Sequence, residues 1–492
     1  MLAELEALDY KKVYYYFSEI AAIPHGSGNV GKLADYLEKF AKERAVRYIR
    51  DAADNIIFYK EASAGYEHLP TLILQGHMDM VCEKEAGADI DFTKDGLTLK
   101  TDGEWLYADR TTLGGDDGIA VAYCLAILDD EALQHPALEL VITTEEETGM
   151  DGAKALDATA LSGKYLLNID SEEENVVLCG CAGGARVTGQ FPVEHALAGG
   201  RTAKVTVRGL QGGHSGVEID KNRTNAVLFL ARYLYLLREK VPFLTAEFSG
   251  GQKDNAIPRD ADALLLFPED VSGEAVAMAE QIAKEMVAEI HGAEPEAELC
   301  FSVDEYVQEM PVMHPRAFEK VLFVLLQAPN GVQVNSAEIP GLVESSLNLG
   351  ICKMTSGGLE LHWSLRSSKA SYLRFLKEKL TYLIGFLGGD YEVSGEYPAW
   401  EYKETSKLRE VYAKAYEELL GKKPEFATVH AGLECGLFSE KKPGLDMISI
   451  GPKMLDIHTP AERLHIASAI RIYKLLEQVL EKGFRDFAEQ RR

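Results

Sequence analysis

The chain has 492 residues, which is too long for one ordinary hydrophobic core and predicts two or three domains. Its formal net charge of −27 excludes general nucleic-acid binding and adhesion to anionic membranes, because both need a basic face. No apolar run reaches the roughly 18–20 residues of a membrane span, and the N-terminus lacks the pattern of a signal peptide. Seven scattered cysteines are typical of a reduced, cytoplasmic protein.

The first 185 residues alternate between predicted helices and predicted strands. Helical apolar spacing occurs at 10–22 and 31–44, and short apolar runs at 71–74, 138–142 and 165–169 predict buried strands. This alternation indicates an α/β domain with a mainly parallel sheet. Ligands bind beyond the carboxyl ends of such strands, and polar residues follow all three of these runs.

From residue 186 to 400 the predicted elements follow a different order. A β-α-β-β-α-β series is predicted from strands 203–208, 245–249 and 261–267 with helices 225–237 and 274–289. It recurs from strand 299–303 onward, through helices 317–326 and 372–386 and strands 345–352, 359–366 and 391–393. The remaining predicted elements alternate as in the first 185 residues: a helix at 407–420, a strand at 447–450 and a long helix at 460–482. We therefore expect residues 1–185 and 401–492 to form one α/β domain, with an α+β domain of residues 186–400 inserted into it.

Acidic residues and histidines gather at the predicted strand ends. His77 and Asp79 share one strand face, and a metal-bound histidine usually gives its other ring N–H to a carboxylate. Glu146 and Glu147 lie in a run of three carboxylates that leaves a buried strand, and such a run repels itself unless a cation or a proton intervenes. Asp170 ends the next strand.

Two further residues have simpler explanations when taken alone. Asp116 stands at a glycine-flanked helix start, where it could be a helix cap, and His458 follows a strand, where it could be a capping or core histidine. Two histidines and three carboxylates at the strand ends of one sheet are nevertheless improbable by chance. Imidazole and carboxylate suit zinc, manganese or cobalt, and a bridging carboxylate permits two metal ions.

The order of motifs along the chain closely resembles the aminoacyl-histidine dipeptidases. This PepD-like family, also called Xaa-His or cytosol non-specific dipeptidases, belongs to the co-catalytic di-zinc peptidases. The resemblance covers nearly the whole chain. It rests on His77-Met-Asp79, Gly114-Gly-Asp-Asp-Gly118, Glu146-Glu-Thr-Gly149, Asn168-Ile-Asp-Ser-Glu-Glu-Glu174, Gly213-His-Ser-Gly216, Asn255-Ala-Ile-Pro258, His430-Ala-Gly-Leu-Glu-Cys-Gly436 and His458.

The resemblance implies a role for each residue of the constellation. Asp116 would bridge two divalent metal ions, zinc by expectation, with manganese or cobalt as alternatives. One ion would add His77 and Asp170, and the other Glu147 and His458. Asp79 would orient His77, and Glu146 would act as general base toward a metal-bridging water that attacks the peptide carbonyl.

Two positions depart from the family pattern, which usually has Asn where this chain has Asp117 and Gly where it has Arg110. Asp117 adds negative charge beside the metal ions unless it pairs, for example with Arg110. These departures leave metal preference open. The resemblance also implies a cis peptide bond between Asp116 and Asp117.

The inserted domain would act as a lid that carries substrate-binding residues. The resemblance implies that His214 polarises the substrate carbonyl and that Asn255 and Arg366 hold a terminal carboxylate. The alternatives are a turn histidine and an ordinary surface arginine. His430 and Glu434, which are four residues apart, would share a helix face or a loop near the substrate.

The sequence therefore predicts a cytoplasmic metallo-dipeptidase that hydrolyses unblocked dipeptides, including Xaa-His. Dipeptides are the expected partners, without nucleic acid or membrane, and a homodimer is compatible with the sequence. The alternatives are an N-acyl-amino-acid amidohydrolase or tripeptidase on the same scaffold, and a non-catalytic peptide- or metal-binding protein. Preferred dipeptides and the physiological metal are left open.

Overall fold

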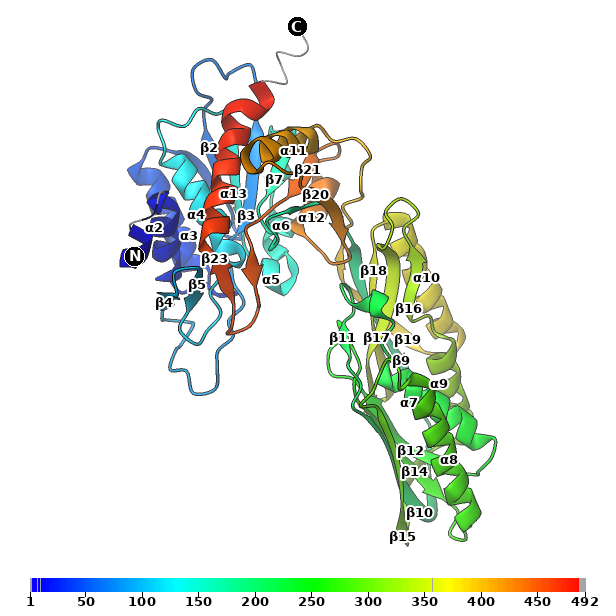
Figure 1. Cartoon of the computed structure of the whole chain (residues 1–492). Coiled ribbons are helices and arrows are strands. Elements are labelled where there is room, and N and C mark those ends of the chain that lie inside the picture. Colours follow the sequence, from blue (N-terminus) through cyan, green and yellow to red (C-terminus); the bar gives the residue numbers. More distant parts are fainter. Residues whose placement is uncertain (1, 7, 9, 356, 486–492) are drawn as a thin grey trace. The chain divides into compact units, whose positions relative to one another are not determined.

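The chain divides into two compact units, which are seen in a computed structural model that describes residues 2–6, 8, 10–355 and 357–485 (Figure 1). The first unit comprises Met1–Cys181, Tyr402–Thr428 and Leu433–Arg492. The second comprises Ala182–Glu401 and the short segment Val429–Gly432. The expected boundaries at 185 and 401 lie within a few residues of this division, but the 429–432 segment was expected in the first unit.

The first unit is built on an eight-stranded sheet. Its strands, in spatial order, are β1 (Arg47–Arg50), β2 (Ile56–Lys60), β6 (Leu138–Thr143), β3 (Leu72–His77), β7 (Tyr165–Asn168), β21 (Asp446–Ser449), β8 (Val176–Cys181) and β20 (Glu425–Val429). The four strands from β6 to β21 are parallel, while β1, β2 and β8 pair in antiparallel fashion. The sheet is therefore mixed rather than mainly parallel, because short loops add antiparallel strands at its margins.

The first unit also contains nine α-helices among its described residues, and all but α5 bury small or apolar residues. They are α1 (Ala3–Glu6), α2 (Lys11–Ala21), α3 (Gly31–Glu43), α4 (Gly115–Leu128), α5 (Glu146–Gly149), α6 (Asp151–Ala155), α11 (Lys407–Leu420), α12 (Glu434–Lys441) and α13 (Ile466–Gln478). Every residue of α4 is buried, which agrees with the continuous apolar run from Ile119 to Leu128. A single core joins α2, α3, α4, α11 and α13 to the central strands.

The predicted helix at 460–482 begins later than expected. Residues Arg463–His465 form strand β23 in a small sheet with β22 (Met454–Leu455), β5 (Trp105–Ala108) and β4 (Leu99–Thr101). The helix α13 starts only after His465, whose ring accepts the N–H of Ser468. Pairing of β23 with β5, which is more than 350 residues away in sequence, overrides the helical pattern of this segment.

The second unit contains a nine-stranded antiparallel sheet. Its strands, in spatial order, are β15 (Glu298–Met313), β10 (His195–Arg208), β14 (Ala261–Phe267), β12 (Leu244–Gly250), β17 (Val343–Thr355), β18 (Gly358–Ser367), β9 (Gly183–Phe191) and β19 (Asp390–Tyr397), with β16 (Gly331–Asn335) beside β17. Four helices cover one face of this sheet (Figure 1): α7 (Ala226–Arg238), α8 (Gly273–Ile290), α9 (Pro315–Gln327) and α10 (Ala370–Phe386).

This sheet consists of two halves with the same order of elements. The first half is β10-α7-β12-β14-α8-β15, and the second is β9-α9-β17-β18-α10-β19. The strand predicted at 299–303 was expected to open the second half. It lies instead in β15, which pairs with β10 and closes the first half, whereas β9 supplies the missing strand. Strand partners are long-range contacts that a local pattern does not encode.

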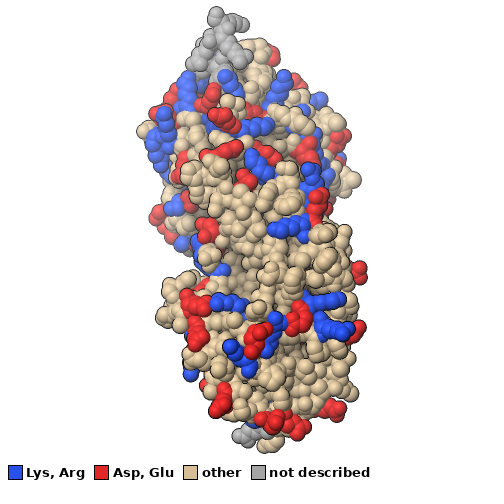
Figure 2. Space-filling model, turned by 90° about the vertical axis from the view of Figure 1, so that its right-hand side faces the viewer, with Lys and Arg blue, Asp and Glu red and all other residues tan. Residues whose placement is uncertain are grey.

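Among the residues that the structure describes, none of the helices combines the length and the apolar character that a membrane span requires. On the face drawn in Figure 2, basic and acidic side chains are interspersed, so the net charge of −27 is not gathered into one acidic patch on that face.

Candidate metal centre

Three parallel strands of the first unit deliver three of the five predicted ligands, His77, Glu147 and Asp170, to one edge of the sheet. In the register of these strands, His77 at the end of β3 lies opposite Thr143 at the end of β6. Gln75 of β3 lies opposite Asn168, which ends β7 two residues before Asp170. Glu146 and Glu147 begin the short helix α5 just beyond β6. The strand ends therefore converge as the sequence predicts.

The first predicted ligand set is assembled around the buried ring of His77. Its Nε2 atom lies 3.2 Å from an oxygen of Asp116 and 3.7 Å from an oxygen of Asp170. Burial by itself lowers the pKa of His77, but the surrounding acids Asp116, Asp170 and Asp79 raise that pKa well above its usual value. Burial raises the pKa of Asp170 to about 7. A cation is therefore strongly favoured among these oxygens.

The second predicted ligand set uses the other oxygen of Asp116. His458 places its Nε2 3.2 Å from this oxygen and 3.0 Å from a carboxylate oxygen of Glu147. Hydrogen bonds to Asp116 and Glu147 raise the pKa of His458 to about 11. Asp116 thus stands between the two histidines, with one oxygen directed to each.

The donor set fits two divalent metal ions. Metal–ligand distances of about 2.0–2.1 Å in a tetrahedral site place neighbouring ligand atoms about 3.3 Å apart. In each of the two sets, one ligand atom from every member lies within 4.8 Å of the others, and the closest pairs are at 3.0 to 3.2 Å. Imidazole nitrogen and carboxylate oxygen are ligands suited to zinc, manganese and cobalt. Asp116 is the residue common to both sets.

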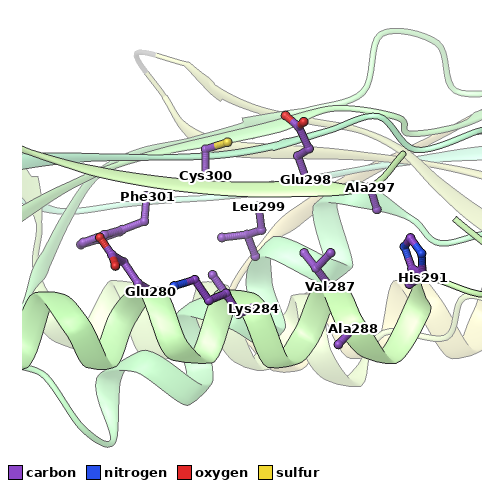
Figure 3. Close-up of a pocket in the computed structure, with 11 residues that line it drawn as sticks. Glu280, Lys284, Val287, Ala288, His291, Ala297, Glu298, Leu299, Cys300 and Phe301 are labelled. Carbon is purple, nitrogen blue, oxygen red and sulfur yellow. The ribbon is translucent and has the colours of Figure 1, made fainter. Parts of the chain in front are cut away.

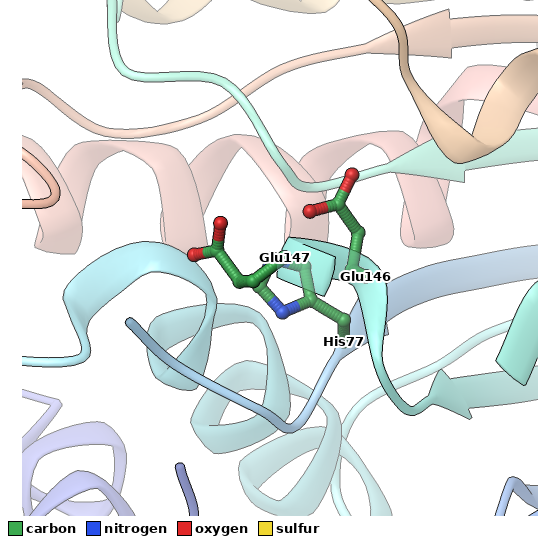
Figure 4. Close-up of side chains that lie close together, drawn as sticks. All are labelled: His77, Glu146 and Glu147. Carbon is green, nitrogen blue, oxygen red and sulfur yellow. The ribbon is translucent and has the colours of Figure 1, made fainter. Parts of the chain in front are cut away.

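Glu146 and Glu147 leave the same helical turn in different directions (Figure 4). His77, Glu146 and Glu147 form a third group whose ligand atoms lie within 4.8 Å of one another. Only Glu147 of this pair contacts His458, which assigns it to the second ligand set. Burial raises the pKa of Glu146 well above its usual value. Glu146 therefore lies near the candidate metal centre but belongs to neither of the two ligand sets that share Asp116.

Asp79 makes different contacts from those expected. The Nδ1 atom of His77 hydrogen-bonds to the backbone carbonyl oxygen of Asp79 at 2.9 Å, and the Asp79 carboxylate is 3.5 Å away. The carboxylate instead accepts the backbone N–H groups of Glu146 and Glu147 and the hydroxyl of Ser27. Asp79 therefore orients His77 mainly through its main chain and positions the two glutamates through its side chain.

Asp117 is fully buried and does not pair with Arg110. One of its oxygens accepts the backbone N–H of His77 at 3.2 Å, and the other has no hydrogen-bond partner among the described residues. Burial raises the pKa of Asp117 well above its usual value. Arg110 is bound to Glu85 at 2.9 Å. The peptide bond between Asp116 and Asp117 is cis, which confirms that expectation.

The second unit contains a separate cluster formed by Arg366, His214 and His430. All three lie around Gly216, because a Cβ atom added there would stand 2.6 Å from the carbonyl oxygen of His430, 3.0 Å from the His214 ring and 3.1 Å from Nε of Arg366. Arg366 is 8% exposed, and its guanidinium donates to the hydroxyl of Tyr397 at 3.1 Å. Among the described residues it has no ion-pair partner and its Nε atom has no acceptor.

The two histidines of this cluster are electrically neutral. Nδ1 of His214 accepts the N–H groups of Gly216 and Val217, so the ring proton is on Nε2. Burial, with Arg366 nearby, lowers the pKa of His430 to about 3, and its Nε2 is 2.7 Å from the hydroxyl of Ser346. The cluster therefore carries one uncompensated positive charge, on Arg366.

The other two predicted substrate-binding residues lie in different surroundings. Asn255 is beside the His214 loop, where its backbone carbonyl accepts the N–H of Ser215. Glu434 belongs to the first unit, is completely buried, and accepts hydrogen bonds from Gln75 and Thr143. Because α12 begins at Glu434, His430 and Glu434 do not share a helix face.

A cavity of about 620 Å³ in the second unit lies away from these residues (Figure 3). Helix α8 and strand β15 line it, through side chains that include Lys284, Val287 and Phe301. None of the predicted site residues contributes to it, so it gives no support to the metal centre.

Sequence reasoning missed two residues that support the metal centre. The hydroxyl of Ser27 donates to Asp79, and nothing in its sequence surroundings marks it. Glu462 accepts four consecutive backbone N–H groups from Leu113 to Asp116. The Thr459-x-x-Glu462 spacing, typical of a capping box, was the available signal, but it does not reveal so distant a partner.

Comparison with known proteins identifies related chains. Residues 73–482 match the model of peptidase family M20/M25/M40. The cytosol non-specific dipeptidase of Escherichia coli is 37% identical over 98% of this chain and 99% of its own length. The crystal structure of an aminoacylhistidine dipeptidase from Vibrio alginolyticus superposes with a TM-score of 0.87 at 33% identity, covering 97% of this chain and 98% of its own. A tripeptidase from Staphylococcus aureus has a TM-score of 0.56 at 15% identity, covering 97% of this chain and 99% of its own, and shows a shared fold alone.

Proposed function

The chain belongs to peptidase family M20/M25/M40, and we propose that it is a dipeptidase whose reaction takes place at the metal centre around Asp116. The observation that carries this proposal is the position of Asp116, whose two oxygens each lie 3.2 Å from a different histidine. A carboxylate shared in this way supports a site for two metal ions. The whole-length similarity to two dipeptidases supports the reaction.

His77, Asp116 and Asp170 would hold one metal ion, and Asp116, Glu147 and His458 the other. When bound, divalent ions supply Lewis-acid polarisation of the peptide carbonyl and lower the pKa of water. We propose zinc as the resident metal, with manganese and cobalt as the alternatives that the same donor types accept.

Glu146 is the general base of this proposal. Its carboxylate stands beside the ligand sets, within 4.8 Å of ligand atoms of His77 and Glu147, where it can take a proton from a water held at the centre. The proton that it takes from the attacking water would then be given to the amino group of the leaving amino acid. Asp79 fixes the turn on which this base stands.

The Arg366 cluster would bind the free carboxylate of the dipeptide. A buried guanidinium without an acidic partner is costly, and a carboxylate can satisfy it with charge-assisted hydrogen bonds. The Nε2–H of His214 can donate a hydrogen bond to the carbonyl oxygen of the substrate, because the other ring nitrogen, Nδ1, accepts the N–H groups of Gly216 and Val217. We also propose that Asn255, His430 and Glu434 belong to the substrate pocket.

We propose unblocked dipeptides as substrates, including Xaa-His compounds such as β-alanyl-histidine. The N-acyl-amino-acid amidohydrolase, the tripeptidase and the non-catalytic binding protein are the competing functions. We place the protein in the cytoplasm, because its described cysteines are free thiols and because the relative in Escherichia coli is named a cytosol enzyme.

Turnover by metal-stripped and reloaded protein tests the proposed function. The substrates are Ala-His, N-acetyl-His and Ala-Ala-His, each assayed with zinc, manganese or cobalt. We expect cleavage of Ala-His that depends on added metal, with the blocked and longer compounds cleaved much more slowly. Preferred cleavage of N-acetyl-His would establish the amidohydrolase instead, and metal-independent cleavage would overturn the proposed centre.

A further inference from the structure

Glu462 joins two distant parts of the chain beside the metal centre. Its side chain is 3% exposed and directed at the start of helix α4. One carboxylate oxygen accepts the N–H groups of Leu113 at 2.7 Å and Gly114 at 3.1 Å. The other accepts those of Gly115 at 2.8 Å and Asp116 at 3.4 Å.

These four N–H groups have no acceptor within their own segment. The first N–H groups of a helix lack intrahelical partners, and Gly114 at the cap position has no side chain to supply one. Gly114 also has a φ of 65°, a left-handed conformation that glycine adopts without a steric penalty. Regular helical geometry begins only after Asp117, so the backbone that carries Asp116 is held from outside the helix.

Glu462 is also four residues from His458. Both lie on the segment between β22 and β23, and His458 itself has a φ of 60° in the left-handed region, which is uncommon for a residue with a side chain. Such a conformation persists where its surroundings hold it. Glu462 ties this segment to the 113–116 loop at the point where Asp116 and His458 approach within 3.2 Å.

We propose that Glu462 is a positioning residue that sets the separation between Asp116 and His458 and thereby the affinity of the second metal site. This inference rests on the proposed function for the existence of two metal ions. Glu462 acts through hydrogen bonds to the backbone and is not itself a ligand in either set. Groups that orient metal ligands typically change metal affinity by about 10–100-fold when they are removed.

Two substitutions of Glu462 separate hydrogen bonding from charge. Glu462→Gln keeps the size of the side chain but replaces one acceptor oxygen with an NH₂ group that faces two N–H donors. Glu462→Asp keeps the charge and withdraws the carboxylate by one methylene. Both should disturb the 113–116 loop, so both should weaken the second metal site.

Glu139→Gln is the matched control in the same unit. Glu139 is 4% exposed and accepts the N–H groups of Ser162 and Gly163, but it lies at the opposite end of β6 from Thr143. The Glu139→Gln substitution should lower the free energy of unfolding by about as much as Glu462→Gln does. It should leave metal binding unchanged, because no metal ligand is near its bonds.

The experiment is a cobalt titration of the metal-stripped full-length chain, followed by visible absorption and by competition with a chelator. We expect two binding steps in the unchanged protein. Glu462→Gln and Glu462→Asp should weaken the binding step of the Asp116, Glu147 and His458 set by about 10–100-fold, with altered absorption bands of the ion held there. The step of the other set should weaken less, because it shares only Asp116 with the disturbed segment. Glu139→Gln should reproduce the unchanged protein.

Three outcomes would count against these ideas in different ways. Unchanged affinities in both steps for either Glu462 variant would overturn the positioning role. A loss of the same size in Glu139→Gln would reduce the effect to general stability and would also overturn it. Fewer than two cobalt ions in the unchanged protein would contradict the proposed function itself. Should Glu462→Gln fail to fold, Glu462→Asp carries the test.

Discussion

The carboxylate of Asp79 accepts the backbone N–H of Glu146 at a distance of 3.0 Å. Its second oxygen accepts the N–H of Glu147 at 3.3 Å, and the backbone carbonyl oxygen of Asp79 accepts a hydrogen bond from Nδ1 of His77 at 2.9 Å. One residue just beyond β3 therefore holds both His77, a proposed ligand of the first set, and the turn that carries the proposed base. The side chain and the main chain of Asp79 have separate tasks, which can be tested separately.

Asp79→Asn should lower kcat by about 10–100-fold while the chain still binds two metal ions. The amide offers one acceptor oxygen in place of two, so one of the two glutamate N–H groups loses its partner. The bond from His77 to the backbone carbonyl is left in place. Steady-state kinetics and metal analysis check this, with Ser27→Ala as a milder control that removes only one donor to Asp79. Full activity of Asp79→Asn would show that the Asp79 side chain does not position the two glutamates. Loss of one metal ion would show that the side chain, and not only the main chain, is needed to hold the ligands.

Glu146→Gln should reduce turnover by about 10²–10⁴-fold, the usual contribution of a general base, with metal content close to two ions per chain. The substitution keeps the size of the side chain and removes the proton acceptor. Glu147→Gln should instead lose metal, because it weakens a ligand that lies 3.0 Å from His458. Metal analysis beside single-turnover kinetics distinguishes the two. Equal metal loss in both variants would contradict the assignment.

A free substrate carboxylate should matter to cleavage if Arg366 binds it. We expect Ala-His to be cleaved well and Ala-His-amide poorly, because the amide loses a charge-assisted pair and leaves the guanidinium poorly satisfied, at a cost of about 1–3 kcal/mol. Arg366→Ala should narrow the difference in kcat/KM between the two substrates. Equal kcat/KM for acid and amide in the unchanged enzyme would eliminate Arg366 as the carboxylate-binding group and leave the metal centre unaffected.

His430 should make the folded chain less stable in mild acid. Burial and the nearby Arg366 lower its pKa to about 3, whereas an unfolded histidine takes up a proton near pH 6.5. The unfolded state therefore binds the extra proton first, and stability falls as the pH drops from about 6.5 toward 3. Between pH 7 and pH 5 this contribution is on the order of 2 kcal/mol.

Comparison of the unchanged protein with His430→Asn isolates this effect. Urea denaturation of both proteins at pH 7 and pH 5 gives the change in unfolding free energy for each. The unchanged protein should lose about 2 kcal/mol more than the variant over this interval. Parallel losses would mean that His430 is not held in its neutral form by the fold.

Much of the residue cluster at the candidate metal centre was predictable from the sequence because its proposed ligands follow local rules. Buried apolar runs identify strands, parallel strands share a carboxyl edge, and polar residues that follow such runs must meet there. His77, Glu147 and Asp170 obey this rule directly. Asp116 and His458 were recognised through motif order rather than strand position. The series of helices and strands was predictable for the same local reason.

Partners across the chain were decided only by the tertiary structure. The sequence marked Asp79 as an acid near His77, but the fold directed its carboxylate to Glu146 and Glu147 and left its carbonyl to the ring. Glu462 had no visible role until folding brought it to N–H groups 346 to 349 residues away. Local sequence determines most of the elements that form and the chemical groups that end them, but long-range pairing with β5 made a strand of Arg463–His465 where the local pattern predicted a helix. Backbone hydrogen-bond partners and strand neighbours depend on packing between distant segments, and this packing is what brings Asp116 to His458.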